Sequence, residues 1–361
     1  YGDSVLTAFL EGAKSKVKAF DWNIGKLTQI PTLHKGDLLS IIGQPKVGKS
    51  SIAIGEIVYP LIISGKSVAY YSCEMSEASL YNKLMLKHLY SKYNVKVQSK
   101  IAFSYLIVSL FKISRNLDDE YLGKVFGESV RRKSIAEGKR VNQGPLLTEE
   151  EYKKASFLKD HFKNYFTIDN SLAESIMLAY HDLFTSGKYG NLYILREEKN
   201  GMSLTELNPF IVEDMFSYIQ ELLNKTEGVL DGIVIDHAAH FKSLKMDSSN
   251  MTPIITEVYK QAKDIAENKE HPLFVCVINH TNKAFIKDDL DAQSTRAHGT
   301  SESGKTADLE IILYQTPEDL KDGIVSLRVQ YSRDEQINTK DPVIKMYADR
   351  GVCDFTAIQD T

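Results

Sequence analysis

Residues 43–50 combine the residue types and the spacing needed to hold a chain of phosphates. They match the pattern G-x-x-x-x-G-K-S. Glycines at both ends of such a loop let the backbone turn tightly and bring its N–H groups close to phosphate oxygens. Lys49 would reach the β- and γ-phosphates of ATP, and the Ser50 hydroxyl would ligate Mg²⁺. The expected nucleotide-binding residues are Gly43, Gln44, Pro45, Lys46, Val47, Gly48, Lys49, Ser50 and Ser51.

The segments on either side of this loop are of the kind that the motif requires. Residues 38–42 form a short apolar run that suits a buried strand, and residues 51–57 have a composition compatible with a helix. A strand, a glycine loop and a helix in that order place the loop N–H groups and the helix N-terminus against a polyphosphate. We therefore expect a nucleotide site here rather than an ordinary glycine-rich turn.

Two carboxylates follow further apolar runs. Glu74 comes shortly after the predicted strand of residues 67–72, and Asp236 ends the apolar run that starts at residue 232. In α/β sheets ligands bind at the carboxyl ends of the strands. Glu74 is therefore a candidate base for an attacking water, and Asp236 is a candidate for orienting Mg²⁺.

The other predicted elements indicate the fold class. Further strands are expected over residues 273–278 and 309–314, and helices over 76–93 and 210–223. Residues 325–331 and 343–347 are typical of a final hairpin, with residues 332–341 as its loop. Alternating strands and helices predict an α/β fold: a mostly parallel central sheet flanked by helices, with a C-terminal β-hairpin.

The domain organisation follows from the same pass along the chain. Residues 1–36 are expected to hold an amphipathic helix and a connector, with the main domain in 37–361. The apolar face of the helix docks either on its own domain or on a neighbouring subunit. Residues 95–165 are interpreted as a mainly helical insertion. The first residue is Tyr1 rather than Met, so a missing N-terminal domain is one expectation.

Composition narrows the class of protein. The chain has 361 residues, of which 43% are hydrophobic and 25% charged, values that are ordinary for a globular protein. No apolar run is long enough to cross a bilayer, so no membrane partner is expected. Three cysteines without metal-ligand spacing favour a reducing cytosol, and the net charge of −4 means that any nucleic-acid contact must be local.

Several short segments together resemble one known family. After the P-loop come Ser-Cys-Glu-Met at 72–75, Ile-Asp-His at 235–237, Asn-His-Thr-Asn-Lys at 279–283, and Glu-Ser-Gly followed by Ala-Asp within 302–308. The set is similar to the ATPase domain of the DnaB-type hexameric replicative helicases, most closely the T-even phage form. The resemblance extends over roughly residues 25–350 apart from the insertion.

The resemblance implies a RecA-like fold, a hexameric ring, and ATP-driven movement along single-stranded DNA in DNA replication. It also implies a primase and a helicase loader as partners, in the cytoplasm of a bacterial or phage-infected bacterial cell. It assigns the catalytic glutamate to Glu74 and the Walker B aspartate to Asp236. Arg333 would be a finger reaching the neighbour's γ-phosphate, and His280 would replace the family's Gln as a γ-phosphate sensor. Tyr331 and Ser301 depart from the family's Lys and Arg.

DNA contacts are expected in two polar stretches, residues 281–305 and residues 240–252, because the net charge of −4 requires a focused site. The basic residues at 131–140 form either an alternative DNA site or a solvated face. The candidate DNA-binding residues are Lys242, Lys245, Lys283, Lys287, Arg296 and Lys305.

Three functions remain open at this point. The favoured one is an ATP-hydrolysing ring helicase. The second is a RecA-like recombination or repair ATPase that forms filaments, which the Ser-Cys-Glu-Met and Glu-Ser-Gly elements disfavour. The third is a nucleotide-binding loading or assembly factor, which the departures at Tyr331 and Ser301 keep open.

Overall fold

The computed structural model describes residues 18–19, 30–99, 102, 170–196, 207–247, 249–280, 306–333 and 344–358. Its chain divides into two compact units. The larger unit comprises Tyr1–Glu77, Gly190–Arg350 and Asp354–Thr361, and the smaller comprises Ala78–Tyr189 and Gly351–Cys353. The predicted helix of residues 4–20, the basic residues at 131–140, most of the insertion and most of the final hairpin loop lie outside the described residues.

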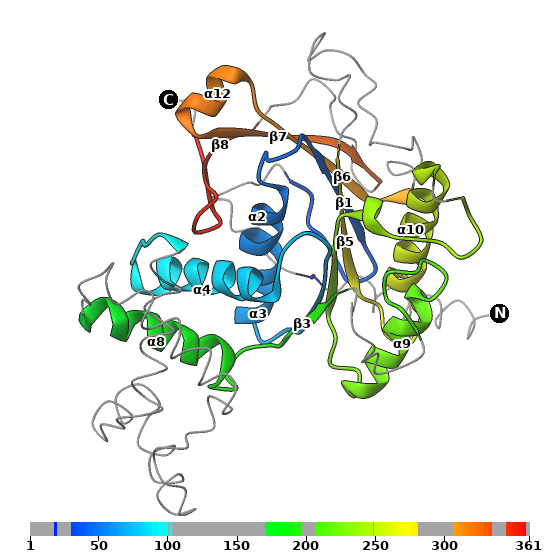
Figure 1. Ribbon diagram of the computed structural model, residues 1–361, viewed down its shortest axis with the longest axis horizontal. Helices are drawn as coiled ribbons and strands as arrows, with labels where there is room; N and C mark the ends of the chain where they lie inside the picture. Colours follow the sequence, from blue (N-terminus) through cyan, green and yellow to red (C-terminus); the bar gives the residue numbers. More distant parts are fainter. Residues whose placement is uncertain are drawn as a thin grey trace, which may run out of the picture. The chain divides into compact units, whose positions relative to one another are not determined.

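The larger unit is built on one sheet (Figure 1). Within the described residues the sheet has nine strands in the order β3-β2-β4-β5-β1-β6-β7-β8-β9. The strands are β1 (Leu38–Gly43), β2 (Val68–Ser72), β3 (Leu192–Leu195), β4 (Gly232–Asp236), β5 (Phe274–His280), β6 (Leu309–Tyr314), β7 (Ile324–Ser332), β8 (Ile344–Asp349) and β9 (Asp354–Ala357).

Strand direction divides the sheet into two parts. Every pairing among β1 to β6 is parallel, whereas β7, β8 and β9 are added antiparallel. β1 lies between β5 and β6, so the P-loop leaves the sheet from a central strand. These findings confirm the predicted α/β fold with a mostly parallel sheet and a C-terminal hairpin. The short strand β9 was not predicted.

Helices cover both faces of this sheet. The helical segments of the larger unit are α2 (Lys49–Ala53), the π-helical η1 (Ile54–Val58), α3 (Tyr59–Ile63), α9 (Met215–Lys225), the 3₁₀ helix η3 (Ala238–His240), α10 (Met251–Ala266) and α12 (Pro317–Asp322). In Figure 1, α2 and α3 lie on one side of the sheet and α9 and α10 on the other. Among the described residues, no helix has the length and apolarity needed to span a bilayer.

The helix after the P-loop changes its pitch before a proline. α2 passes into η1, and Pro60 stands in the first turn of α3. Proline has no N–H to donate to the preceding turn, and a widened π turn absorbs that interruption without ending the helical segment. The helix therefore continues through the apolar run of residues 57–63.

The core between the sheet and the α9–α10 layer is apolar and aromatic. The buried side chains of α10 include Ile254, Val258, Ala262 and Ile265, at the spacing of one helical face. A buried polar pair also joins the layers, because the hydroxyls of Ser40 on β1 and Tyr259 on α10 lie 3.0 Å apart. This packing fixes β1, and with it the start of the P-loop.

The described part of the smaller unit is formed mainly by α4 (Glu77–Tyr93) and α8 (Asn170–Phe184). Asp182 of α8 accepts hydrogen bonds from the hydroxyl of Tyr93 at 2.7 Å and from Lys92, and His88 Nε2 lies 3.4 Å from it. Although burial of Asp182 acts in the opposite direction, these bonds lower the pKa of that carboxyl. The helix expected over residues 76–93 is confirmed.

Candidate nucleotide site

Each of the two glycines at the ends of the P-loop has a structural reason. A Cβ added to Gly43 would lie 2.6 Å from the carbonyl oxygen of Leu313 on β6, closer than real Cβ contacts come. At the other end, Gly48 has φ of 107° and precedes the first turn of α2. Positive φ is strained for a residue with a Cβ. The two glycines of the motif are therefore explained by close approach and by conformation.

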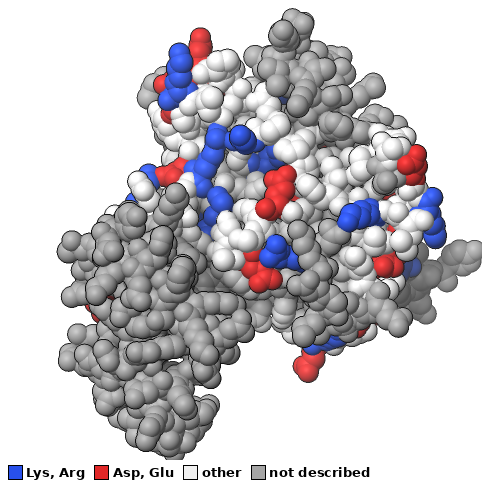
Figure 2. All heavy atoms as spheres, viewed as in Figure 1, with Lys and Arg blue, Asp and Glu red and all other residues white. Residues whose placement is uncertain are grey.

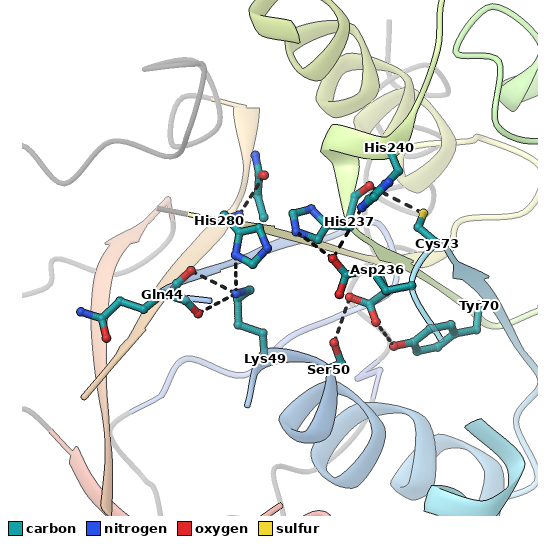
Figure 3. Close-up of polar contacts among 12 residues, drawn as sticks. Gln44, Lys49, Ser50, Tyr70, Cys73, Asp236, His237, His240 and His280 are labelled. Atoms are coloured by element: carbon teal, nitrogen blue, oxygen red, sulfur yellow. Dashed lines mark hydrogen bonds and ion pairs between the residues drawn. The ribbon is translucent and has the colours of Figure 1, made fainter. Parts of the chain in front are cut away.

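Lys49 points back into the loop (Figure 3). Its Nζ donates to the carbonyl oxygens of Gly43 at 3.0 Å and Gln44 at 2.8 Å, and lies 2.8 Å from Nδ1 of His280. Burial lowers the pKa of Lys49 to about 8, although Asp236 and Glu74 act in the opposite direction. Burial and the charge of Lys49 lower the pKa of His280, so its imidazole is neutral at pH 7 and Nδ1 accepts the hydrogen bond.

Asp236 lies at the carboxyl end of β4 and is only 2% exposed. One carboxylate oxygen accepts from the hydroxyl of Ser50 at 3.1 Å, and the other from the hydroxyl of Tyr70 at 2.7 Å. Burial raises the pKa of Asp236, while both hydrogen bonds act to lower it. Hydroxyl and carboxylate oxygens are the donors that Mg²⁺ prefers, so this pair fits the metal expected from the sequence.

Glu74 lies in the turn after β2 and is 51% exposed. Its Oε1 is 3.7 Å from Nε2 of His237 and 3.5 Å from Nε2 of His240. His237 follows Asp236 with φ of 102° and ψ of 87°, a left-handed backbone that is uncommon outside glycine. The ring centroids of His237 and His280 are 3.9 Å apart. The carboxylate is thus flanked by imidazoles at the same edge of the sheet as Lys49.

Most of the predicted nucleotide residues meet at this edge. Of the remaining loop residues, Val47 and Ser51 are buried, whereas Pro45 and Lys46 are exposed and Gln44 is half-buried. Parallel strands β1, β2, β4 and β5 end here together, and their register brings Gly43 opposite His280 and Ser72 opposite Asp236. The chemistry is therefore gathered from four strand ends.

Arg333 lies elsewhere. Its guanidinium pairs with the Asp308 carboxylate at 2.9 Å, and its backbone N–H donates to the backbone carbonyl of Asp308. Asp308 in turn accepts from the backbone N–H of Leu38, at the start of β1. Arg333 thus lies beside the start of the six-residue strand β1, which extends over about 16 Å at ~3.3 Å per residue before it ends at Gly43. The structure does not bring it to the P-loop of its own chain.

Two candidate DNA-binding residues fall in a described loop. Lys242 and Lys245 are exposed. Glu213 orders this loop by accepting from the backbone N–H groups of Leu244 at 3.1 Å and Lys245 at 3.2 Å, and from the hydroxyl of Ser243. The candidates Lys283, Lys287, Arg296 and Lys305 lie outside the described residues.

On the face shown in Figure 2, Lys and Arg side chains gather in one band, and elsewhere both charge signs are interspersed. The described part of this face therefore offers a local group of cations rather than a broad basic surface. A local group agrees with the net charge of −4.

Four residues of the site were not predicted from the sequence. Tyr70 and His240 had no signal in the sequence, and His237 belonged to the Ile-Asp-His segment without a role of its own. Hydrogen-bond direction, backbone conformation and spatial proximity are not visible in residue types. The fourth is Arg350, in the turn between β8 and β9. Its side chain would lie 3.4 Å from a Cβ on Gly48, and it donates to Oε1 of Gln315 at 2.5 Å. Burial lowers the pKa of Arg350.

Comparison with known proteins gives structural likeness alone. No family model and no curated protein matches the sequence. One solved structure, the ATPase domain of a phage helicase, is 13% identical, with 99% of this chain and 98% of that chain covered and a TM-score of 0.55. A second structure, a DnaB-like replicative helicase described with its interactions with primase, is 14% identical. The match covers 99% of this chain and 67% of that chain, with a TM-score of 0.55. The chain therefore has the RecA-like fold of the DnaB-like helicase ATPase domains.

Proposed function

We propose that this chain is the ATP-hydrolysing motor of a ring helicase that moves along single-stranded DNA. The observation that carries the proposal is the meeting of Lys49, Ser50, Asp236 and Glu74 at one edge of the sheet, beside a P-loop with the required backbone. Each side chain has the chemistry that one part of phosphoryl transfer needs. The shared fold with DnaB-like helicases supports the same assignment.

Lys49 is the phosphate-binding cation. Its ammonium has two neutral carbonyl partners, and phosphate oxygens are stronger acceptors because they carry charge. Ser50 and Asp236 would hold Mg²⁺, which neutralises charge on the phosphates when bound. Tyr70 fixes the second oxygen of Asp236, so the carboxylate keeps its orientation.

Glu74 is the base for the attacking water. Its carboxylate is half exposed and is separate from the hydrogen-bonded pair of Ser50 and the buried Asp236, so a water can reach it. A positioned carboxylate base contributes about 10²–10⁴ in rate. His280 would report the γ-phosphate through its hydrogen bond to Lys49.

The ring is the second part of the proposal. Because Arg333 lies at the far end of β1 from its own P-loop, it would contact the γ-phosphate bound by a neighbouring subunit. If Arg333 moved away from Asp308, that carboxylate would keep hydrogen bonds, because it also accepts from Lys263 and from the backbone N–H of Leu38. DNA contacts would come from Lys242 and Lys245, and from Lys283, Lys287, Arg296 and Lys305. Primase and a helicase loader remain the proposed protein partners.

The direct test of this function combines three measurements on one preparation. ATP hydrolysis with and without single-stranded DNA, displacement of a strand from a forked duplex, and particle shape by electron microscopy should all be recorded, with Lys49→Ala as the control. We expect DNA-stimulated hydrolysis, ATP-dependent displacement and closed rings. Filaments with strand exchange would support the recombination ATPase instead, and DNA-independent hydrolysis without displacement would exclude a helicase.

The finger in trans has its own test. Arg333→Ala and Lys49→Ala should each hydrolyse ATP poorly, and mixing them should restore part of the activity, because one interface then combines an intact P-loop with an intact arginine. An arginine finger is worth ~10³–10⁵ in rate, so even partial restoration is measurable. Subunit exchange is verified with labelled subunits. No restoration despite exchange would exclude a role for Arg333 across the interface.

A further inference from the structure

Three potential metal ligands converge beside the proposed Mg²⁺ site. Glu74, His237 and His240, here called the glutamate cluster, each offer one ligand atom, and these atoms all lie within 4.8 Å of one another. They come from the turn after β2, from the residue after β4, and from the end of η3. The cluster thus joins two strand ends that the fold already holds in register.

Two of the three ligand separations are close to those around a small metal ion. A tetrahedral zinc with ligands at about 2.0–2.2 Å separates its ligand atoms by about 3.3–3.5 Å. In the glutamate cluster, Oε1 of Glu74 is 3.7 Å from Nε2 of His237 and 3.5 Å from Nε2 of His240. Closing around an ion would therefore require shifts of only a few tenths of an ångström on those two edges.

The donor set selects the kind of metal. Two imidazoles and one carboxylate suit zinc and similar transition metals, whereas Mg²⁺ prefers oxygen donors throughout. The pair of Ser50 and Asp236 supplies oxygens alone. The two sites would therefore discriminate between metals by ligand type, although both lie at the end of β4.

The backbone supports a rigid ligand at the centre of the cluster. His237 is buried and takes a left-handed conformation at φ of 102°, while Glu74 and His240 are about half exposed. A non-glycine residue in this region is strained, and such residues are concentrated at functional sites. One fixed ligand and two solvent-facing ligands leave a coordination position open to water, as in three-ligand zinc sites.

We propose that the glutamate cluster binds a divalent transition metal such as Zn²⁺, and that the bound metal inhibits ATP hydrolysis by occupying the Glu74 carboxylate. The inhibitory part rests on the proposed function, because it requires Glu74 to be the base. The binding part does not, since it depends on the three ligands alone.

The binding test uses Co²⁺ as a spectroscopic substitute for zinc, on tag-free protein in Mg²⁺ buffer without nucleotide. We expect one Co²⁺ per chain with the visible bands of a tetrahedral site. Loss of a surrounding hydrogen bond already weakens metal sites by about 10–100-fold, so His240→Asn should weaken binding by at least about 100-fold. His237→Asn should do the same, and circular dichroism reports whether that buried position still permits folding.

Cys73→Ser is the matched control, because this thiol is beside Glu74 and its Sγ lies 3.7 Å from the carbonyl oxygen of His237. It should bind Co²⁺ as the wild type does, without change in the spectrum. A thiolate charge-transfer band that disappears in Cys73→Ser would place the metal on the cysteine and overturn the proposal. Absence of Co²⁺ binding, or binding that His240→Asn leaves unchanged, would also overturn it.

The inhibition test compares each protein with its own metal-free activity. Micromolar free Zn²⁺, with Mg²⁺ in excess, should inhibit ATP hydrolysis by the wild type and by Cys73→Ser, and EDTA followed by fresh Mg²⁺ should restore it. His240→Asn should escape inhibition in the same range. Metal binding without any effect on hydrolysis would overturn the inhibitory part. A protein that binds Co²⁺ but never hydrolyses ATP would refute the proposed function and leave the metal site standing.

Discussion

Two groups of side chains lie at the same edge of the sheet and are held in different ways. The phosphate cluster, which comprises Lys49, Ser50, Tyr70 and Asp236, has its polar atoms in hydrogen bonds of 2.7–3.1 Å. The glutamate cluster has separations of 3.5 and 3.7 Å, and two of its three side chains are about half exposed. The first group is mostly buried and fixed, and the second is mostly open to solvent.

The difference follows from what each group would do. A phosphate site benefits from charges fixed before the nucleotide arrives, because preorganised charge needs no rearrangement during the reaction. A base must reach a water molecule and then release a proton, which requires exposure and some freedom. The same freedom is what would let the glutamate cluster accept a metal ion.

Within the phosphate cluster, the largest effect is expected for Lys49→Ala, which removes its cation. Hydrolysis should fall by at least ~10²–10³, the loss typical of one transition-state donor, as measured by phosphate release. Folding should not suffer, because burying a charged lysine with a lowered pKa opposes folding. A marked fall in the urea midpoint would show that Lys49 is structural rather than nucleotide-binding.

Tyr70→Phe tests whether hydrogen bonds fix the phosphate cluster. Tyr70 is fully buried, and its hydroxyl donates to the Asp236 carboxylate at 2.7 Å. Losing a hydrogen bond to a charged group should lower the free energy of unfolding by about 1.5–3 kcal/mol and raise the Mg²⁺ concentration needed for hydrolysis.

Tyr71→Phe is the matched control for Tyr70→Phe. Tyr71 is the next residue of β2 and is also fully buried, but its hydroxyl has no hydrogen-bond partner among the described residues. Its replacement should leave the urea midpoint unchanged or raise it. Equal destabilisation by both substitutions would mean that packing, and not the bond to Asp236, is what matters.

Nucleotide affinity should depend on pH through Lys49. Its pKa of about 8 lies below the ordinary value of 10.5, so the free protein loses this charge above pH 8. Affinity for MgATP should then fall by up to about tenfold per pH unit, and Lys49→Ala should show no such slope in equilibrium titrations. If the affinity of Lys49→Ala depended on pH with the same slope as that of the wild type, another group would be the one that titrates.

The lowered pKa of Lys49 also predicts how the free energy of unfolding changes with pH. Between pH 8 and 10.5 the unfolded chain binds more protons than the folded protein, because the folded-state pKa of Lys49 is the lower one. Through this group alone, the free energy of unfolding should therefore rise with pH across that window. The rise should be absent from Lys49→Ala.

The smallest effect is expected at His280. Its neutral Nδ1 accepts from Lys49 at 2.8 Å, and a glutamine oxygen can accept in the same way. His280→Gln should stay within about threefold of the wild-type rate, whereas His280→Ala should lose about 2–10-fold, the value of one typical hydrogen bond, because Lys49 keeps its two carbonyl partners. Equal losses in both variants would show that the imidazole itself is required.

The phosphate cluster was largely predictable from the sequence, because its key residues belong to continuous motifs. Lys49 and Ser50 follow a recognisable strand and glycine loop, and Asp236 ends an apolar run. Carboxyl ends of parallel strands meet at one edge, so the predicted strands implied that Ser50 and Asp236 lie close together. The parallel sheet and the final hairpin could be predicted for the same reason.

The rest depended on geometry that residue types do not reveal. The left-handed backbone of His237 is unexpected for a non-glycine residue, and the hydroxyl of Tyr70 meets Asp236 from a strand 166 residues away in sequence. Arg350 was missed because β9 was not predicted, and its turn depends on that strand. The position of Arg333 at the far end of β1 follows from the pairing of β6 with β7.

The central claim is that Glu74 activates water at a nucleotide held by the phosphate cluster. The most direct test measures MgATP affinity and the single-turnover rate of hydrolysis for Glu74→Gln, with Glu77→Gln, an exposed glutamate three residues along the chain, as the control. We predict that Glu74→Gln binds MgATP within about threefold of the wild type, a change of ~0.7 kcal/mol. It should hydrolyse ATP about 10²–10⁴ times more slowly, whereas Glu77→Gln keeps the wild-type rate. A wild-type rate for Glu74→Gln would contradict the claim.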